Sequence, residues 1–239
     1  MSVLRFPDPA LELFARESAK VIESVDEIIL ERLAQIGLRL DSQDASPRSV
    51  RGAIAASAKF VEREVDVTEL SKDVINLADE FHKDEVARSF RDAGAQMAIR
   101  PEVSDEALRD FRTTLARRYE ESIGEHLEFV ERVTVEGVKD GRRAADIAEQ
   151  FAERSEAAQT KLELLARDTL GTLKSFQDVE RMQKLGVERY RWLTSEDERV
   201  RDTHAALNGS IQRFDQPPLV GHPGEDWMCR CVEQPLIGV

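Results

Sequence analysis

The sequence predicts a mainly α-helical protein, in which an elongated helical N-terminal region is followed by a small α+β module with a short β-sheet. Through residues 1–185, apolar residues recur three and four positions apart, as they do on the buried face of a helix. Beyond this region the composition changes, because both tryptophans and four of the eight prolines lie there. Short runs of alternating polarity, typical of strands, occupy the same part. We therefore expect a helical region over residues 1–185 and an α+β module over residues 186–239.

Three helices are expected first. An Asp-Pro pair at residues 8–9 has the form of a helix N-cap followed by a first-turn proline. Gly37 is expected to end or bend this helix. A Ser-Pro pair at residues 46–47 opens a second helix, and an apolar stripe predicts a third over about 67–93.

A break separates these helices from the next ones. The Arg-Pro pair at residues 100–101 disfavours helix, and Ser104 can cap a helix that begins at the following residue. The stretch 138–143 has the composition of a turn. Two further helices are expected over 142–153 and 156–184.

The helical region carries no clustered Ser/His/Asp set and no Gly-rich phosphate loop. Its two histidines, His82 and His126, lie on predicted helices. We interpret both as ordinary surface or packing residues.

The C-terminal module has the pattern strand, helix, strand, loop and strand. The strands are expected over 187–194, 210–214 and 229–236. Ser195 and Glu198 have the spacing of a capping box, and Asn208-Gly209 would end the helix between the first two strands. A loop rich in Pro and Gly follows the second strand, and something must pin it. Trp227, His222 and the last strand are the candidates.

The net charge limits the classes of partner. It is −13, whereas broad binding to nucleic acid needs a basic surface that releases phosphate counterions. No apolar run approaches the roughly 18 residues of a membrane span, and the N-terminus lacks the pattern of a signal peptide. Two cysteines with a single residue between them do not form a disulfide framework. We expect a protein made in a reducing cytoplasm, with weak DNA contact at most and no membrane partner.

The order of motifs beyond about residue 140 resembles the C-terminal module of the phage Mu F-like head morphogenesis proteins. That family pattern comprises a Trp-containing strand, an Arg-x-x-His helix, an Asn/Asp-Gly turn, a Pro-rich loop and a terminal Cys-Arg-Cys. In this sequence the motifs fall on Trp192, Arg201 and His204, Asn208 and Gly209, Pro217 and Pro218, and Cys229, Arg230 and Cys231. The stretch "ARDT" within the predicted last long helix is similar to an "ART"-like stretch of the family.

The resemblance implies a structural function. Such proteins are minor head proteins of tailed phages and prophages, located in the procapsid or virion and made in the host bacterial cytoplasm. The implied partners are the portal protein and the major capsid or scaffold proteins, with a role in capsid assembly and in how DNA is packaged or ejected. No established catalytic activity comes with the resemblance, and we expect no enzyme.

The His and Cys residues near the C-terminus allow two interpretations. His204, His222, Cys229 and Cys231 could supply the four ligands of a tetrahedral structural zinc site, because thiols two residues apart in a strand face the same side. In the preferred interpretation the protein has no cofactor, and both thiols pack as small apolar groups beneath Trp192 or Trp227.

An enzymatic function is the alternative. A zinc deaminase pairs His-x-Glu with Pro-Cys-x-x-Cys, and neither spacing is present here. A small metal-dependent or His-based nuclease acting on phage or host DNA could use His204 as general base and Arg201, Arg213 or Arg230 as a phosphate clamp. In the simpler interpretation these arginines pair with neighbouring carboxylates, namely Glu196, Asp197, Asp202, Asp215, Glu225 or Asp226.

Overall fold

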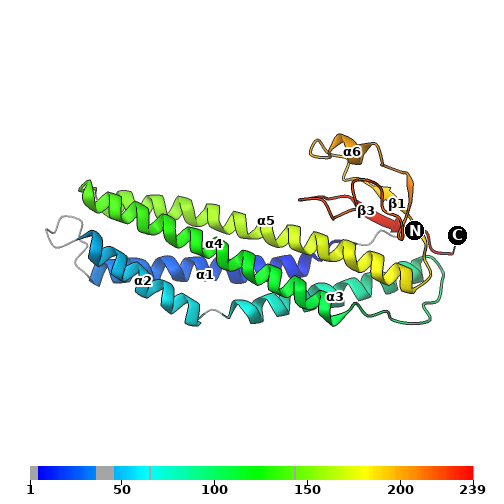
Figure 1. Ribbon diagram of the computed structural model, residues 1–239, viewed down its shortest axis with the longest axis horizontal. Coiled ribbons are helices and arrows are strands. Elements are labelled where there is room, and N and C mark those ends of the chain that lie inside the picture. Colours follow the sequence, from blue (N-terminus) through cyan, green and yellow to red (C-terminus); the bar gives the residue numbers. More distant parts are fainter. Residues whose placement is uncertain (1–4, 36–45, 65, 143, 239) are drawn as a thin grey trace. The chain divides into compact units, whose positions relative to one another are not determined.

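The computed structural model describes residues 5–35, 46–64, 66–142 and 144–238. Within this part of the chain, long helices are followed by a small antiparallel sheet, which confirms the predicted fold class (Figure 1). The elements are α1 (Asp8–Gln35), α2 (Pro47–Glu64), α3 (Val67–Asp92), α4 (Asp105–Lys139), α5 (Ala144–Lys184), β1 (Arg189–Leu193), α6 (Asp202–Ala205), β2 (Ile211–Arg213) and β3 (Val232–Pro235). No helix of the described residues combines the length and apolarity that crossing a membrane requires.

Side-chain caps explain where several helices begin. The Oγ atoms of Ser46 and Ser104 each accept a hydrogen bond from the backbone N–H three residues ahead, at 3.2 Å in both cases. Asp66 caps α3 in the same way at 2.9 Å. The predicted starts of the second and fourth helices are therefore confirmed. Gly37, the expected end of the first helix, lies outside the described residues.

The expected gap between helices at residues 153–156 is wrong, because α5 runs through it without interruption. No Gly or Pro occurs between residues 144 and 170, and the stretch is rich in Ala, Glu and Leu, which favour helix. Ser155 fits within the helix by donating its hydroxyl hydrogen to the carbonyl of Phe151 at 2.8 Å.

The helix expected over residues 195–209 is also wrong, because only the four residues of α6 are helical there. Glu196 has a φ of 55°, which no right-handed helix accommodates. Asp197 accepts a hydrogen bond from the backbone N–H of Arg199 at 3.0 Å and also binds Arg230, so this stretch forms a turn. The capping-box pattern therefore did not identify a helix start.

The three predicted strands are present but shorter than expected. Their order is β2-β1-β3, with β1 antiparallel to both neighbours and Trp192 opposite Glu233. The predicted Asn-Gly turn leads into β2. Asn208 accepts a hydrogen bond from the Thr194 N–H at 3.1 Å, and Gly209, with φ 78°, donates its N–H to the Trp192 carbonyl at 2.8 Å.

The chain divides into two compact units, each built from separate segments. One comprises Met1–Glu12, Ser71–Leu115 and Leu164–Val239, and the other comprises Leu13–Leu70 and Ala116–Glu163. The second unit is helical, and its core includes Val25, Ile29, Val50, Ile54, Val130, Ile147 and Phe151.

The first unit contains the sheet and its core. Residues of α3, α5 and the sheet form one apolar cluster, which includes Val86, Phe90, Met182, Tyr190, Trp192, Phe214, Cys231 and Ile237. The sheet therefore packs on parts of α3 and α5 and has no separate core of its own.

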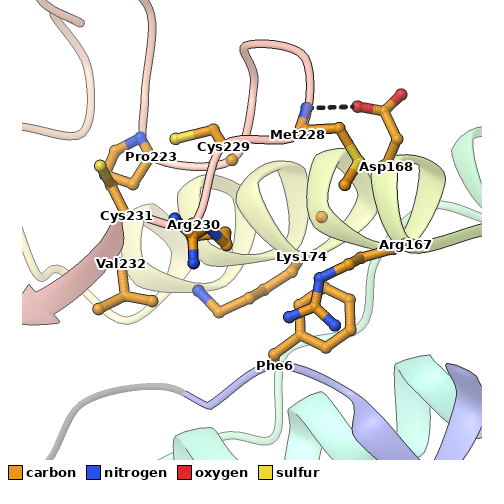
Figure 2. A pocket seen from close by; sticks show the side chains of 12 residues that line it. Phe6, Arg167, Asp168, Lys174, Pro223, Met228, Cys229, Arg230, Cys231 and Val232 are labelled. Carbon is orange, nitrogen blue, oxygen red and sulfur yellow. Dashed lines mark hydrogen bonds between the residues drawn. The ribbon is translucent and has the colours of Figure 1, made fainter. Parts of the chain in front are cut away.

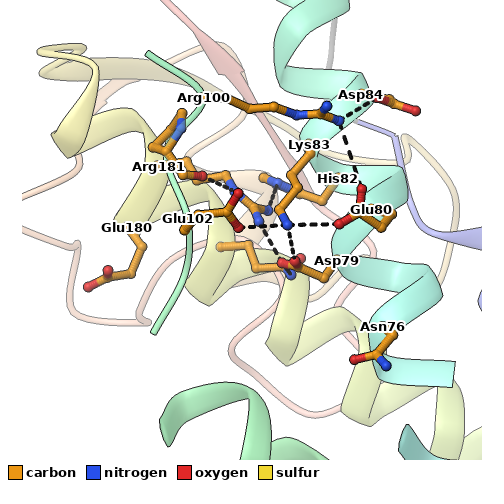
Figure 3. A network of polar contacts seen from close by, with 12 residues as sticks. Asn76, Asp79, Glu80, His82, Lys83, Asp84, Arg100, Glu102, Glu180 and Arg181 are labelled. Atoms are coloured by element: carbon orange, nitrogen blue, oxygen red, sulfur yellow. Dashed lines mark hydrogen bonds and ion pairs between the residues drawn. The ribbon is translucent and has the colours of Figure 1, made fainter. Parts of the chain in front are cut away.

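A buried polar network joins α3 to α5 within the same unit (Figure 3). Arg181 is fully buried and donates to Asp79 at 2.5 Å, to the Pro101 carbonyl at 3.0 Å and to His82 Nδ1 at 2.7 Å. The other ring nitrogen of His82 contacts Asp178 at 2.6 Å. Burial lowers the pKa of His82, so the neutral ring accepts from Arg181 and donates to Asp178. His82 is thus a buried packing residue.

The second histidine of the helical region is buried in the other unit. His126 Nε2 lies 2.9 Å from an Asp26 carboxylate oxygen, and Ser155 donates to the same carboxylate. The interpretation of His126 as a packing residue agrees with this contact.

Candidate metal centre

His204 is held on α6 with its ring in the interior. The short helix begins after Arg201, whose carbonyl accepts hydrogen bonds from the N–H groups of His204 and Ala205 at 2.9 Å. The ring meets the fully buried Trp192 edge-on, with centroids 5.4 Å apart. Strand β1 therefore forms one wall of the site and fixes the plane of the imidazole.

Cys229 and Cys231 lie directly before β3, outside the strand that was expected to contain them. Both sulfur atoms lie on the side away from Phe6 and Lys174 (Figure 2). Arg230, between them, binds Asp197 with both terminal nitrogens at 2.6 and 2.5 Å. This paired contact fixes the short segment that presents the thiols.

The two thiols and the imidazole converge. Each Sγ lies 3.5 Å from His204 Nδ1, and the three donor atoms all lie within 4.8 Å of one another. Zinc binds sulfur at about 2.3 Å and nitrogen at about 2.0 Å, so a tetrahedral site separates a bound nitrogen from a bound sulfur by about 3.5 Å. The spacing of the three donors fits such a site.

His222, the fourth residue of the expected ligand set, lies elsewhere. Its Nδ1 is 2.9 Å from the Tyr190 hydroxyl, and its ring lies near those of Tyr190 and Phe214. Burial lowers the pKa of His222. The structure thus brings three of the four expected residues together and places the fourth in the aromatic core.

The pKa values of the two thiols shift in opposite directions. The adjacent Cys231 thiol lowers the pKa of Cys229 to about 5, and nearby backbone N–H groups and His204 act in the same direction against burial. The same contact and burial raise the pKa of Cys231. The pair therefore favours one thiolate, the form in which cysteine binds metals.

The Arg-x-x-His pair belongs to the surroundings of this site. Asp226 Oδ2 lies 3.4 Å from His204 Nε2 and 3.3 Å from Arg201 Nη1. Arg201 also donates to the Trp227 carbonyl at 2.7 Å. A carboxylate on the far side of an imidazole orients the ring toward a metal ligand position. Asp226 was expected only as an arginine partner, and nothing in its spacing indicates contact with the histidine.

The remaining motif residues form the loop around the site. Pro217 is exposed, and the Pro218 carbonyl accepts a hydrogen bond from the Gly221 N–H at 2.9 Å. Trp227 is 50% exposed, so the buried Trp192 is the tryptophan that lies against the thiols and histidine. Asp168 of α5 accepts a hydrogen bond from the Met228 N–H at 2.9 Å. This contact pins the loop and was not anticipated, although Asp168 lies in the "ARDT" stretch.

The arginines proposed for a nuclease are engaged in ion pairs. Arg213 binds Asp215 at 2.7 Å, Arg230 binds Asp197, and Arg201 approaches Asp226. A cavity of about 70 Å³ adjoins the Cys-Arg-Cys segment (Figure 2). The ion pairs match the simpler interpretation of the arginines.

The family comparison concerns the C-terminal half of the chain. Residues 128–234 match the family model described as Phage Mu protein F like protein, which confirms the resemblance. An uncharacterized protein of Haemophilus influenzae (strain ATCC 51907 / DSM 11121 / KW20 / Rd) is 31% identical over 114 residues. The aligned part covers 47% of this chain but only 26% of that relative. No solved structure matches the chain.

Proposed function

We propose that this protein is a minor head protein of a tailed phage or prophage, which associates with the portal protein and acts in procapsid assembly. The observation that carries the proposal is the match of residues 128–234 to the phage Mu F-like family. The matched range includes β1, α6, β2 and the Cys-Arg-Cys segment, so it covers the whole neighbourhood of His204. A further role in the packaging or ejection of DNA belongs to the same proposal.

The architecture of the site supports a structural role. The arginines around His204 are held by carboxylates. The thiols and the imidazole lie against a shared apolar core that includes residues of α3 and α5. Such an arrangement fixes a surface for assembly more readily than it admits a substrate.

The charge of the chain supports protein partners over DNA. With a net charge of −13, any contact with DNA would depend on a local basic patch and would weaken steeply as salt rises. Within the head, we therefore assign this protein to contacts with the portal and with capsid or scaffold proteins.

Co-expression with the portal protein encoded by the same phage or prophage tests the proposal. A tagged form of this chain should retain the portal through washing at physiological salt, while the tag without this chain serves as the control for specificity. Bound DNA should be lost as salt is raised. Failure to retain the portal, together with tight DNA binding at physiological salt, would contradict the proposal and favour a nuclease.

A further inference from the structure

We propose that Cys229, Cys231 and His204 bind one zinc ion through the two Sγ atoms and Nδ1. The ion would join the end of the Pro/Gly-rich loop to α6 and β1. This site differs from the four-residue set that the sequence indicated, because His222 is excluded and Asp226 is added as an outer partner.

Two sulfur atoms share one nitrogen of His204. Nδ1 of a neutral imidazole has a single in-plane lone pair, which accepts one directed hydrogen bond. Both Sγ atoms nevertheless lie 3.5 Å from it. One S–H donor satisfies that lone pair, and the two thiols also contact each other, whereas an ion at the centre of the three atoms binds all of them. Ordinary packing of thiols does not require this convergence.

Asp226 lies on the far side of the His204 ring as its outer partner. His204 is buried, and its Nε2 makes no hydrogen bond to any residue that the structure describes, although Asp226 lies 3.4 Å away. When Nδ1 binds a metal, Nε2 carries the hydrogen and donates it to a carboxylate, which raises the basicity of the ligand. A small approach of Asp226 completes this arrangement.

The charges of the ion and of its ligands would balance. Zinc with two thiolates and a neutral imidazole has no net charge, so it suits a site beside the buried Trp192. Binding would release the remaining thiol proton to solvent, as zinc requires deprotonated ligands. Among the described residues, no fourth His, Cys, Asp or Glu donor joins this group. Because Cys229 is partly exposed, a water molecule can take the fourth position.

The elements that the ion would connect are small. Helix α6 has four residues and β2 has three. A helix of one turn is not stable alone, and a metal ion is a common way to hold such short elements. The ion would tie α6 and β1 to the segment that precedes β3.

Metal analysis of the full chain, purified without chelator, tests the site. We expect one equivalent of zinc by elemental mass spectrometry, and its loss in Cys229→Ser, Cys231→Ser and His204→Ala. His222→Gln is the matched control and should retain one equivalent. Absence of zinc from the wild-type chain, with both thiols unreactive until unfolding, would overturn the proposal in favour of packing.

A titration of the wild-type chain covers the case in which a variant fails to fold. After removal of bound metal, cobalt(II) should bind one to one and give the absorption bands of a tetrahedral site with thiolate charge transfer. Failure of these bands to appear would also overturn the site.

Asp226 has its own test. Asp226→Asn should weaken zinc binding by about 10- to 100-fold in competition with a chelator. Asp202→Asn, which alters an exposed carboxylate on α6, should leave the affinity unchanged. Equal affinities in the two variants would overturn the role of Asp226.

Discussion

Gly224 allows the C-terminal loop to lie directly against α5. Its φ is 93°, a conformation that other residues rarely adopt, and a Cβ atom there would lie 2.8 Å from the Gly171 carbonyl oxygen. Ser175 would be 3.3 Å from the same position. Gly171 itself lies within α5, and a Cβ added to it would meet its nearest neighbour at an ordinary 3.9 Å. The two glycines face each other, but only Gly224 is required by its conformation and its close contact with α5.

Substitution of these glycines should have opposite effects. We expect Gly224→Ala to lower the free energy of unfolding by about 1–3 kcal/mol, because both the backbone and the contact with α5 are strained. Gly171→Ala should leave stability unchanged or raise it by up to about 1 kcal/mol, because alanine favours helix. Urea unfolding of both variants measures the difference. Equal destabilisation would show that the loop does not approach α5 in this way.

Strand β3 is attached to α5 through buried charges. Lys174 donates to Asp178 at 2.5 Å and to Glu233 at 3.0 Å, and all three side chains are buried. Burial raises the pKa of Glu233 well above its usual range, and the negative Asp178 adds to this effect against the attraction of Lys174. Burial also opposes ionisation of Asp178, yet Lys174 and His82 hold its pKa below the usual range. One cation and one carboxylate therefore remain charged, and Glu233 is neutral.

The pH dependence of stability tests this assignment. Above the usual glutamate pKa of 4.5, the unfolded chain loses a proton that folded Glu233 keeps, so this group lowers the free energy of unfolding as pH rises. Glu233→Gln removes this pH-dependent decrease in the free energy of unfolding. The stability of the variant relative to wild type should therefore increase from about pH 4.5 upward, as measured by urea unfolding at a series of pH values.

A matched control is Glu121→Gln, which alters an exposed glutamate of α4 that pairs with Arg117. Its difference from wild type should stay within about 1 kcal/mol over the same range. A relative stability of Glu233→Gln that falls with rising pH would mean that Glu233 is ionised in the folded protein.

Local signals in the sequence identify most elements but not all of their limits. Ser46 and Ser104 predicted helix starts because a cap acts over three residues. The pattern at Ser195 and Glu198 failed, because the ion pair of Asp197 with the distant Arg230 holds the chain in a turn. A contact between residues so far apart in the sequence cannot be inferred from the spacing of neighbouring residues.

The sequence predicted part of the candidate site, namely the two cysteines, but not which histidine lies beside them. Cys229 and Cys231 share a side because they are two residues apart, and the sequence indicated this although they precede the strand. Whether His204 or His222 joins them depends on the fold. Tyr190 holds one histidine at 2.9 Å, whereas Trp192 and α6 direct the other toward the thiols.

At the scale of the whole molecule, the change in composition near residue 185 differs from the division into compact units. The unit that contains the sheet also includes Met1–Glu12 and Ser71–Leu115. Its core combines Val86 and Phe90 of α3 with Tyr190 and Trp192 of β1. Composition follows secondary structure along the chain, whereas compact units follow packing between distant segments. A boundary between independently folding domains at residues 185 and 186 stays a prediction.

The protein content of purified particles tests the proposed function most directly. Quantitative mass spectrometry should be applied to procapsids and virions prepared from bacteria that carry the corresponding phage or prophage. We expect this protein in procapsids together with the portal, in fewer copies than the major capsid protein. Its absence from both kinds of particle, while it is present in the lysate of the same cells, would contradict a role as a minor head protein.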